Sequence, residues 1–147
     1  MLNNLLKKIF IDDKLKNDVD FLSGVKLFSG VSRHSLAKIA LITFKKKYVK
    51  GETIYDENNP ADVFYIIKEG EVKLAASIGH KNITAGGFFG ETALINGAKR
   101  DASAVALTNS QLYLIYRVKF DDMVENDSHA GLKIMRNLVN ALAGHEI

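Results

Sequence analysis

Cysteine and tryptophan are both absent from this 147-residue chain, and histidine occurs only four times. Without cysteine, the protein has neither a disulfide framework nor a thiolate metal site, which is compatible with a reducing compartment. The histidines are scattered, and no two of them are spaced as ligands of one metal ion. We therefore expect no metal centre at the histidine positions, which are His34, His80, His129 and His145.

The signature motifs of common enzymes are also missing. The sequence contains no GxSxG elbow, no Walker phosphate loop and no HExxH zinc motif. These absences favour a protein that is not an enzyme and that needs no catalytic cofactor.

Long apolar runs and a strong net charge are missing as well. The N-terminal stretch MLNNLLKKIF is interrupted by Lys7 and Lys8, so it fits neither a signal peptide nor a membrane span. The formal net charge of +3 is too small to indicate a nucleic-acid partner without a basic stripe. The three lysines at 45–47 fit a solvated strand edge better than a phosphate contact. We expect a soluble, cytoplasmic protein with no membrane or nucleic-acid partner.

The composition that remains is that of a globular domain, with 47% hydrophobic and 25% charged residues. A chain of this length is sufficient for one hydrophobic core. The hydrophobic period changes twice along the chain, which predicts one domain over residues 1–147 in three segments. These are N-terminal helices at 1–42, a β-structure at 43–117 and C-terminal helices at 118–147.

The helical segments show apolar spacings of three and four residues. Ser32 is a plausible N-cap for a helix whose buried face is Leu36, Ile39 and Ala40. Ser128 is the predicted cap of the C-terminal helix. The two predicted apolar stripes are Leu2, Leu5, Leu6, Ile9 and Phe10 near the N-terminus, and Leu132, Met135, Leu138 and Val139 or Leu142 near the C-terminus.

The middle segment contains short strands separated by turn signals. Six stretches have strand character: TFKKKYV, ETIYDE, DVFYIIKEG, EVKLAASI, SAVAL and SQLYLIYR. The stretch SIGHKN (77–82) indicates a tight hairpin turn, with Gly79 at a position suited to a positive φ. Closely spaced strands of this kind predict a small antiparallel sandwich or barrel, and hence the α+β class.

The loop FFGETALINGAKRDASA (88–104) carries one carboxylate and one guanidinium near its ends, Glu91 and Arg100. Gly90 allows a ligand to approach the backbone closely, and ETAL predicts one helical turn whose N-terminus attracts an anion. Arg100 offers a planar fork to phosphate oxygens, whereas Glu91 accepts hydrogen bonds, for example from a sugar hydroxyl. The loop therefore predicts a site for a sugar phosphate of low charge.

This loop resembles the phosphate-binding cassette of the cyclic nucleotide-binding domain family. The family pattern is F-G-E-x-A-L, five residues, then R, a small residue, A, and S or T; here it is matched at 89–94 and 100–103, apart from Asp101. The resemblance extends over roughly residues 20–140, with Asn58 at a turn where the family usually has glycine. Asparagine tolerates a left-handed backbone. The resemblance implies an antiparallel, jelly-roll-like β-roll with a cassette at 89–103 and a helical lid at 118–147.

The resemblance also implies roles for individual residues. Glu91 is expected to bind the ribose 2′-hydroxyl, and Arg100 the cyclic phosphate of cAMP or cGMP. Backbone N–H groups near Thr92, Ala93 and Ala102 would assist. The predicted ligand-binding set is Gly90, Glu91, Thr92, Ala93, Arg100, Asp101 and Ala102.

Asp101 departs from the pattern, because the family has Ser, Thr or Ala there. Its carboxylate would repel the phosphate, pair with Arg100, point to water, or accept a hydrogen bond from a guanine amino group. The sequence does not choose among these.

Two functions follow. The first is a non-catalytic regulatory module that binds a cyclic nucleotide, with cAMP slightly favoured over cGMP, and that closes a C-terminal lid on it. The second is a degenerate β-roll that has lost the ligand and serves as a protein-interaction module. A DNA-binding regulator is less favoured, because such relatives append a helix-turn-helix domain and this chain ends at Ile147. We expect the output to lie in an effector protein, in a self-dimer through the C-terminal helices, or in a longer chain.

Overall fold

The computed structural model describes the backbone of residues 2–144 and the side chains of residue 4 and of residues 12–144. The apolar stripe predicted near the N-terminus and His145 lie outside the described side chains. The chain divides into two compact units: one combines its two ends, up to Leu41 and from Met123 onward, and the other is Ile42–Asp122. The prediction of one domain over residues 1–147 stays a prediction.

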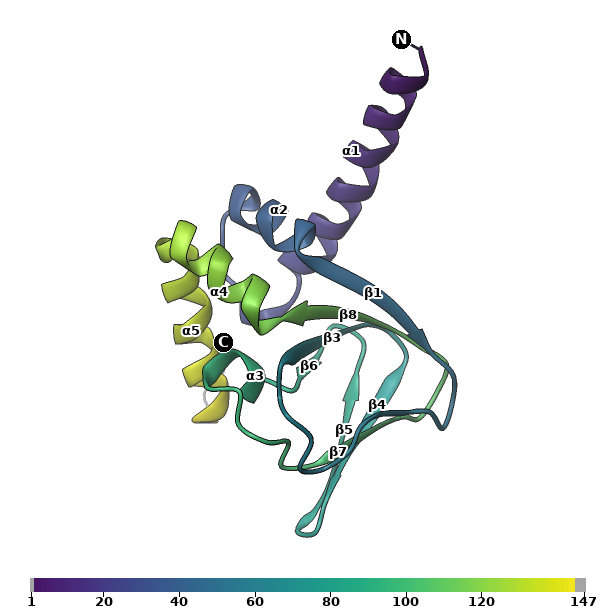
Figure 1. Ribbon diagram of the computed structural model, residues 1–147, viewed down its shortest axis with the longest axis vertical. Helices are drawn as coiled ribbons and strands as arrows, with labels where there is room; N and C mark the ends of the chain where they lie inside the picture. The colour runs from purple at the N-terminus through teal and green to yellow at the C-terminus, as the bar shows by residue number, and fades with distance from the viewer. Residues whose placement is uncertain (1, 145–147) are drawn as a thin grey trace. The chain divides into compact units, whose positions relative to one another are not determined.

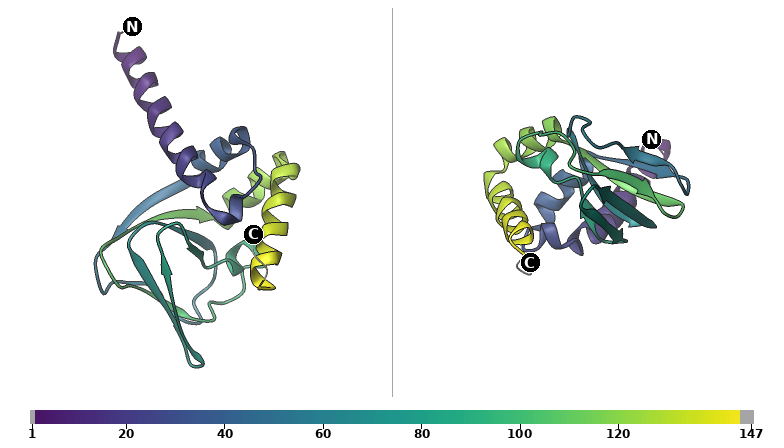
Figure 2. Two further views of the ribbon diagram at one scale, coloured as in Figure 1. Left: turned by 180° about the vertical axis from the view of Figure 1, so that it is seen from behind. Right: turned by 90° about the horizontal axis from the view of Figure 1, so that it is seen from below.

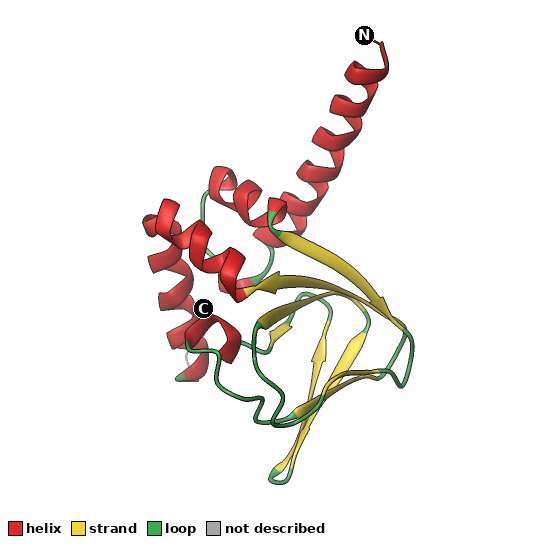
Figure 3. Ribbon diagram, viewed as in Figure 1, coloured by secondary structure: helices red, strands yellow, loops and turns green. Residues whose placement is uncertain are grey.

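The second unit is built from two four-stranded sheets, and every strand pair in them is antiparallel (Figures 1 and 3). One sheet has the order β1-β8-β3-β6 and the other β2-β7-β4-β5. The predicted antiparallel β-structure is thus confirmed. The strands are β1 (Thr43–Tyr48), β2 (Thr53–Tyr55), β3 (Val63–Glu69), β4 (Glu71–Ala76), β5 (Gly79–Thr84), β6 (Phe88–Phe89), β7 (Ser103–Ala106) and β8 (Ser110–Tyr116).

The core of this unit is formed by inward-facing residues of both sheets. Alternate residues point inward because side chains on a strand alternate between faces, as β7 shows with its buried Ala104 and Ala106. Removal of these apolar side chains from water is the main stabilising contribution to the roll. The buried cluster consists of Tyr48, Val63, Tyr65, Ile67, Val72, Ile83, Phe89, Ala104, Ala106, Leu112 and Leu114.

The β4–β5 hairpin projects beyond the other strands of its sheet (Figures 1 and 2). Its turn is Ser77–Ile78, because Ala76 already pairs with Gly79. The predicted turn over 77–82 was therefore too long, since β5 begins at Gly79. The positive φ expected at Gly79 is confirmed at 142°. The short strand β6 was not predicted either.

The helices of the first unit are α1 (Leu2–Ser23), the 3-10 helix η1 (Lys26–Phe28), α2 (Arg33–Leu41) and α5 (Ser128–Leu142). Helix α4 (Arg117–Asn126) crosses the boundary between the units. The predicted buried face of α2, namely Leu36, Ile39 and Ala40, is confirmed. Among the helices that the structure describes, none combines the length and the hydropathy needed to span a membrane.

The predicted N-cap of α2 is confirmed, whereas the predicted N-cap of α5 is wrong. Ser32 caps α2 as predicted, because its Oγ accepts the backbone N–H of Ser35 at 3.2 Å. Ser128 does not cap α5. The carboxylate of Asp127 accepts the backbone N–H of Ala130 instead, so that Ser128 is the first helical residue.

The apolar stripe predicted on α5 is mostly exposed, so it is not the buried face of this helix. Leu132, Val139 and Leu142 are 52%, 60% and 55% exposed, and only Leu138 of the predicted stripe is fully buried. Asn137 is buried in their place, because its Nδ2 donates to the carbonyls of Leu27 and Ser29 at 2.8 and 2.9 Å. The buried residues are Ala130, Gly131, Ile134, Asn137 and Leu138.

Candidate functional site

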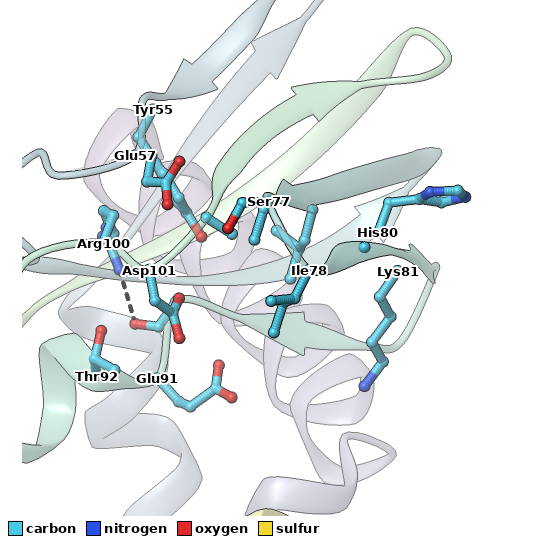
Figure 4. Close-up of a pocket in the computed structure, with 15 residues that line it drawn as sticks. Tyr55, Glu57, Ser77, Ile78, His80, Lys81, Glu91, Thr92, Arg100 and Asp101 are labelled. Atoms are coloured by element: carbon cyan, nitrogen blue, oxygen red, sulfur yellow. Dashed lines mark hydrogen bonds between the residues drawn. The ribbon is translucent and has the colours of Figure 1, made fainter.

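A pocket of about 580 Å³ opens on the β unit beside the predicted loop (Figure 4). Its walls come from the end of β2, from the β4–β5 hairpin, and from the residues that flank the short helix α3 (Thr92–Ile95). Six of the seven predicted residues line it, and Ala93 is buried outside the lining. The lining is Tyr55, Glu57, Leu74, Ala76, Ser77, Ile78, Gly79, His80, Lys81, Gly90, Glu91, Thr92, Arg100, Asp101 and Ala102.

Arg100 is the buried cation of this pocket, with only 4% of the residue exposed. Its two terminal nitrogens donate to the backbone carbonyls of Gly90, at 3.1 Å, and Val63, at 2.5 Å. The guanidinium carbon lies 4.2 Å from the centre of the Tyr55 ring, a cation–π contact. Nε of Arg100 is buried and has no hydrogen-bond partner among the described residues. An unpaired charged donor is costly in a protein interior, so Nε favours an acceptor supplied from outside.

The backbone of Arg100 is fixed by the turn that follows β2. Asn58 donates its N–H to the carbonyl of Arg100, and Arg100 donates its N–H to the carbonyl of Asn59, both at 2.8 Å. Asn58 has a φ of 71°, which confirms the left-handed conformation expected of it. The turn after β2 therefore holds the arginine in register with the pocket.

Gly90 lies close to the side chain of Arg100, and the predicted approach of a ligand to its backbone stays a prediction. Its φ is +76°, and a Cβ there would lie 2.8 Å from a terminal nitrogen of Arg100 and 3.3 Å from the Tyr65 ring. No side chain fits such a space without displacing the guanidinium. Gly90 thus lets Arg100 lie against the strand that leads into α3.

The predicted helical turn is present as α3, and Glu91 precedes it as the N-cap residue. The N–H of Ala93 donates to the carbonyl of Gly90 at 3.2 Å. Since that N–H is engaged, Thr92 and Ala102 remain the backbone donors to consider among those predicted. Glu91 is half-buried, and its carboxylate extends toward the open side of the pocket in Figure 4.

Acidic and basic groups are nearly balanced around the pocket. Among the described side chains, no ion pair joins Arg100 to Asp101, and Asp101 is exposed. Burial is the main cause that raises the pKa of Tyr55 well above its usual value; the nearby Arg100 charge opposes this, while Glu91 and Asp101 add to it. Burial likewise raises the pKa of Tyr65 to about 12. Both phenols therefore stay neutral beneath the arginine.

The opposite wall of the pocket was missed by the sequence analysis. Tyr55, Glu57 and the hairpin residues 76–81 come from strands far from the loop in sequence. Alternation gave no signal for Tyr55, because Thr53, two residues earlier, is exposed and would share its face on a regular strand; the pairing of β2 with β7 is irregular between these two residues. The hairpin carries no signal either, since its tip is solvated on both faces.

These features define an antiparallel β-roll with a pocket that suits a small anion. A family model described as "Cyclic nucleotide-binding domain" matches residues 45–127, more than half of the chain. The chain belongs to the cyclic nucleotide-binding domain family, as its loop indicated.

The comparisons with individual proteins agree with this membership. A cAMP-dependent protein kinase regulatory subunit of Colletotrichum orbiculare is 33% identical over 108 residues, or 71% of this chain and 28% of that protein. A cGMP-dependent protein kinase isozyme of Drosophila melanogaster is 32% identical, over 65% of this chain and 13% of that protein. The chain therefore spans 28% of the length of the first of these relatives and 13% of the second.

A solved structure supports the fold. The regulatory domain of Toxoplasma gondii PKA, crystallised with cAMP, matches with a TM-score of 0.78 and 23% identity. The match covers 91% of this chain and 51% of that one. At this identity the likeness supports the fold alone.

Proposed function

We propose that this chain is a non-catalytic regulatory module, located in the cytoplasm, that binds a cyclic nucleotide in the pocket beside α3. The pocket volume of about 580 Å³ is in the usual range for small-molecule sites, about 300–1,000 Å³. Arg100 is the one buried cation among the lining residues, which suits a ligand with one negative charge, such as a cyclic phosphodiester, rather than a triphosphate. The name of the Colletotrichum orbiculare relative, a regulatory subunit, supports the regulatory role, whereas the Drosophila melanogaster relative is named as a kinase.

The observation that carries the proposal is the unpartnered Nε of Arg100. A phosphate oxygen in the pocket would accept this N–H and satisfy a donor that the protein itself leaves unpaired. The terminal nitrogens are already bonded to Val63 and Gly90, so Nε is the guanidinium donor left for the ligand. Because Nε is buried, a phosphate oxygen would reach it only through a small shift of the loop or of the guanidinium.

The other roles follow from the chemistry of the pocket walls. Glu91 would accept the ribose 2′-hydroxyl, because an ionised carboxylate only accepts hydrogen bonds. The N–H groups of Thr92 and Ala102 would donate to the phosphate. No further cofactor is needed for any of these contacts.

We further propose that Asp101 is turned aside, and that cAMP is slightly favoured over cGMP. The exposure of Asp101 supports this, because a solvated carboxylate repels a phosphate less than a buried one. If Asp101 accepted the guanine amino group instead, cGMP would be favoured.

The C-terminal helices would act as a lid. Leu132, Val139 and Leu142 form an exposed apolar stripe on α5, which is available to cover a bound base. A self-dimer through the same stripe, or an effector protein that binds it, is the competing use of this surface.

Calorimetric titration with cAMP and cGMP in separate experiments tests the proposal. We expect saturable one-to-one binding of both nucleotides, with a modestly smaller dissociation constant for cAMP. AMP, which lacks the cyclic phosphodiester, serves as the control and should bind more weakly.

A second function is favoured by one observation. Three carboxylates, those of Glu57, Glu91 and Asp101, line the pocket beside the single buried arginine. A degenerate β-roll without a ligand would tolerate this excess of acid and would serve as a protein-interaction module. The absence of any heat with either nucleotide, in a protein that unfolds cooperatively, would support this second function.

A further inference from the structure

A second pocket, with a volume of about 560 Å³, lies on the surface of the β unit. It shares no lining residue with the nucleotide pocket. Phe44 and Tyr116 form its floor in an edge-to-face contact, with ring centres 5.6 Å apart. Leu114 lies beside them, across the β1–β8 pair from Phe44. We call this surface the β1–β8 groove; its residues are Phe44, Lys45, Lys46, Asp62, Leu114, Tyr116, Val118 and Lys119.

The groove is an open continuation of the inner face of the first sheet. Phe44 and Lys46 share one face of β1 with Tyr48, which belongs to the buried core cluster. Phe44 is nevertheless 54% exposed, and Val118 at the far rim is 68% exposed. Two large apolar side chains therefore face solvent within one concave surface, which is a feature of binding sites rather than of ordinary surface.

The rim of the groove carries an excess of positive charge. Lys45, Lys46 and Lys119 are lining residues, and Asp62 is the one acidic residue among them. Lys46 is held over the Tyr48 ring at 4.9 Å, which keeps its ammonium near the rim with its charge in place. Lys45 faces Tyr113 across the β1–β8 pair and its ammonium lies over that ring at 5.3 Å, on the other side of the sheet from Phe44 and Leu114. Lys46 and Lys119 therefore offset Asp62 in the groove, which leaves a net charge of +1.

We propose that the β1–β8 groove is a docking site for an acidic peptide segment that carries one aromatic or aliphatic anchor residue. The anchor side chain would pack between Phe44, Tyr116 and Val118, and carboxylates on either side of it would lie against the lysines. Charge complementarity of this kind selects the partner and accelerates its encounter with the site. This inference goes beyond nucleotide binding and assigns the β unit a partner surface of its own.

The chemistry of the rim argues against two other occupants. A second copy of this chain would bring the same lysines to the interface, and like charges repel. Interfacial membrane binding needs an extended apolar face, whereas the large apolar residues most exposed in this groove are only Phe44 and Val118. A single peptide side chain can pack against these two residues.

A set of three blocked pentapeptides tests the proposal. Each has a central phenylalanine, flanked on both sides by two glutamates, two glutamines or two lysines. Amide chemical shifts of the full chain are followed by NMR during titration, in the presence of saturating cAMP so that the nucleotide pocket is filled if it binds. With the glutamate peptide we expect shifts at 44–46, 114–119 and 62, and affinity about tenfold or more above that for the glutamine peptide. The lysine peptide should produce no shifts, and added salt should weaken the glutamate peptide.

Variants locate the binding. Phe44→Ala and Lys119→Glu should each weaken the glutamate peptide at least about fivefold, since both side chains are exposed and their loss leaves the core intact. Val49→Ala is the matched control, because Val49 is an exposed apolar residue of the same unit outside the groove.

The remaining outcomes would overturn the proposal. Equal shifts with all three peptides would show an apolar site without charge selection. Shifts of the same residues on dilution of the free protein would assign the groove to a second copy, and line broadening with anionic phosphatidylserine vesicles but not with peptide would assign it to a membrane. No shift with any probe would leave the groove without this function. None of these results depends on whether cAMP binds.

Discussion

At the scale of single residues, Arg100 is expected to dominate ligand affinity. A hydrogen bond to a charged group contributes roughly 1.5–3 kcal/mol, so Arg100→Ala should weaken cyclic nucleotide binding by about ten- to a few hundredfold. Calorimetric titration measures this directly. Lys99→Ala, which removes an exposed neighbouring cation, is the control and should change affinity less than about threefold.

Arg100→Ala leaves the carbonyls of Val63 and Gly90 without their donors, so the folding of this variant has to be checked by circular dichroism. A folded Arg100→Ala protein with unchanged affinity would exclude the arginine from phosphate binding. Arg100→Lys keeps the charge but loses Nε, and should bind nearly as weakly as the alanine variant.

Gly90 and Gly86 separate backbone strain from the space that the arginine needs. Both have a positive φ, but a Cβ meets nothing within 4 Å at Gly86, whereas at Gly90 it meets Arg100 at 2.8 Å. Gly86→Ala should cost about 1 kcal/mol of unfolding free energy from strain alone. Gly90→Ala should cost roughly 1–3 kcal/mol more because of the clash, and should weaken nucleotide binding. Equal losses in urea unfolding would mean that the guanidinium relocates without cost.

Asp101 is the position where the loop departs from its family pattern. If the carboxylate faced the phosphate at about 4 Å, with an effective dielectric near 20, the repulsion would be on the order of 4 kcal/mol. Because Asp101 is exposed, we expect Asp101→Ala to tighten both nucleotides or to leave them unchanged. A selective loss of cGMP affinity in the titration would show that Asp101 binds the base, and the proposed cAMP preference would then be wrong.

At the scale of elements, the start of α5 depends on Asp127. Its carboxylate accepts hydrogen bonds from the Ser35 hydroxyl at 2.6 Å and the Ala130 N–H at 3.3 Å, and it pairs with Lys38 at 3.2 Å. We expect Asp127→Ala to lower the unfolding free energy by about 1 kcal/mol at pH 7. Ser128→Ala, at the residue that the sequence favoured as the cap, should change it by less than about 0.5 kcal/mol.

The pH dependence of this effect has a definite sign. The hydrogen bond from Ser35 is the largest cause that holds the pKa of Asp127 below its usual value of 3.8. A lowered folded pKa stabilises the fold above the unfolded pKa, and this contribution is lost as the pH falls through the folded value. The difference between wild type and Asp127→Ala should therefore be constant above about pH 5 and shrink below pH 3.8. A difference that grows on acidification would contradict the cap.

The strands show how far pattern alone predicts the elements. Six of the strands were predicted, because short apolar or alternating stretches bounded by turn residues are local properties of the chain: β7 alternates, whereas β3 and β8 are buried almost throughout. β5 was missed because five of its six residues are exposed, so only Ile83 signals the core. The buried face of α5 could not be predicted from the apolar pattern, because Asn137 is buried through bonds to the carbonyls of Leu27 and Ser29, about 110 residues away.

The pocket, too, has one wall that the sequence predicted and another that it did not. The loop with Glu91 and Arg100 was predicted because the chemistry of the site is continuous in sequence there. Tyr55 and the β4–β5 hairpin reach the pocket only through the pairing of β2, β7 and β4, which no local spacing encodes. The hydrogen bonding of the Arg100 guanidinium likewise depends on residues that are distant in sequence, because one terminal nitrogen donates to the carbonyl of Val63, 37 residues away.

At the scale of the whole molecule, the proposed lid belongs to the helical unit and the nucleotide pocket to the β unit. The apolar stripe on α5, Leu132, Val139 and Leu142, is exposed within the helical unit and so has a free energy to gain from being covered. A ligand shifts such a lid only as far as it binds the closed state more tightly than the open one.

Hydrogen exchange measured by mass spectrometry tests the lid. Saturating cAMP should slow amide exchange in residues 128–144, because α5 opens less often when its stripe packs on the bound base. The Arg100→Ala protein at the same cAMP concentration is the control and should show little slowing. Identical exchange with and without nucleotide, in a protein that binds it by calorimetry, would count against a lid. Slowing that follows protein concentration rather than nucleotide would instead assign the stripe to a dimer seam, since only association depends on the number of chains present.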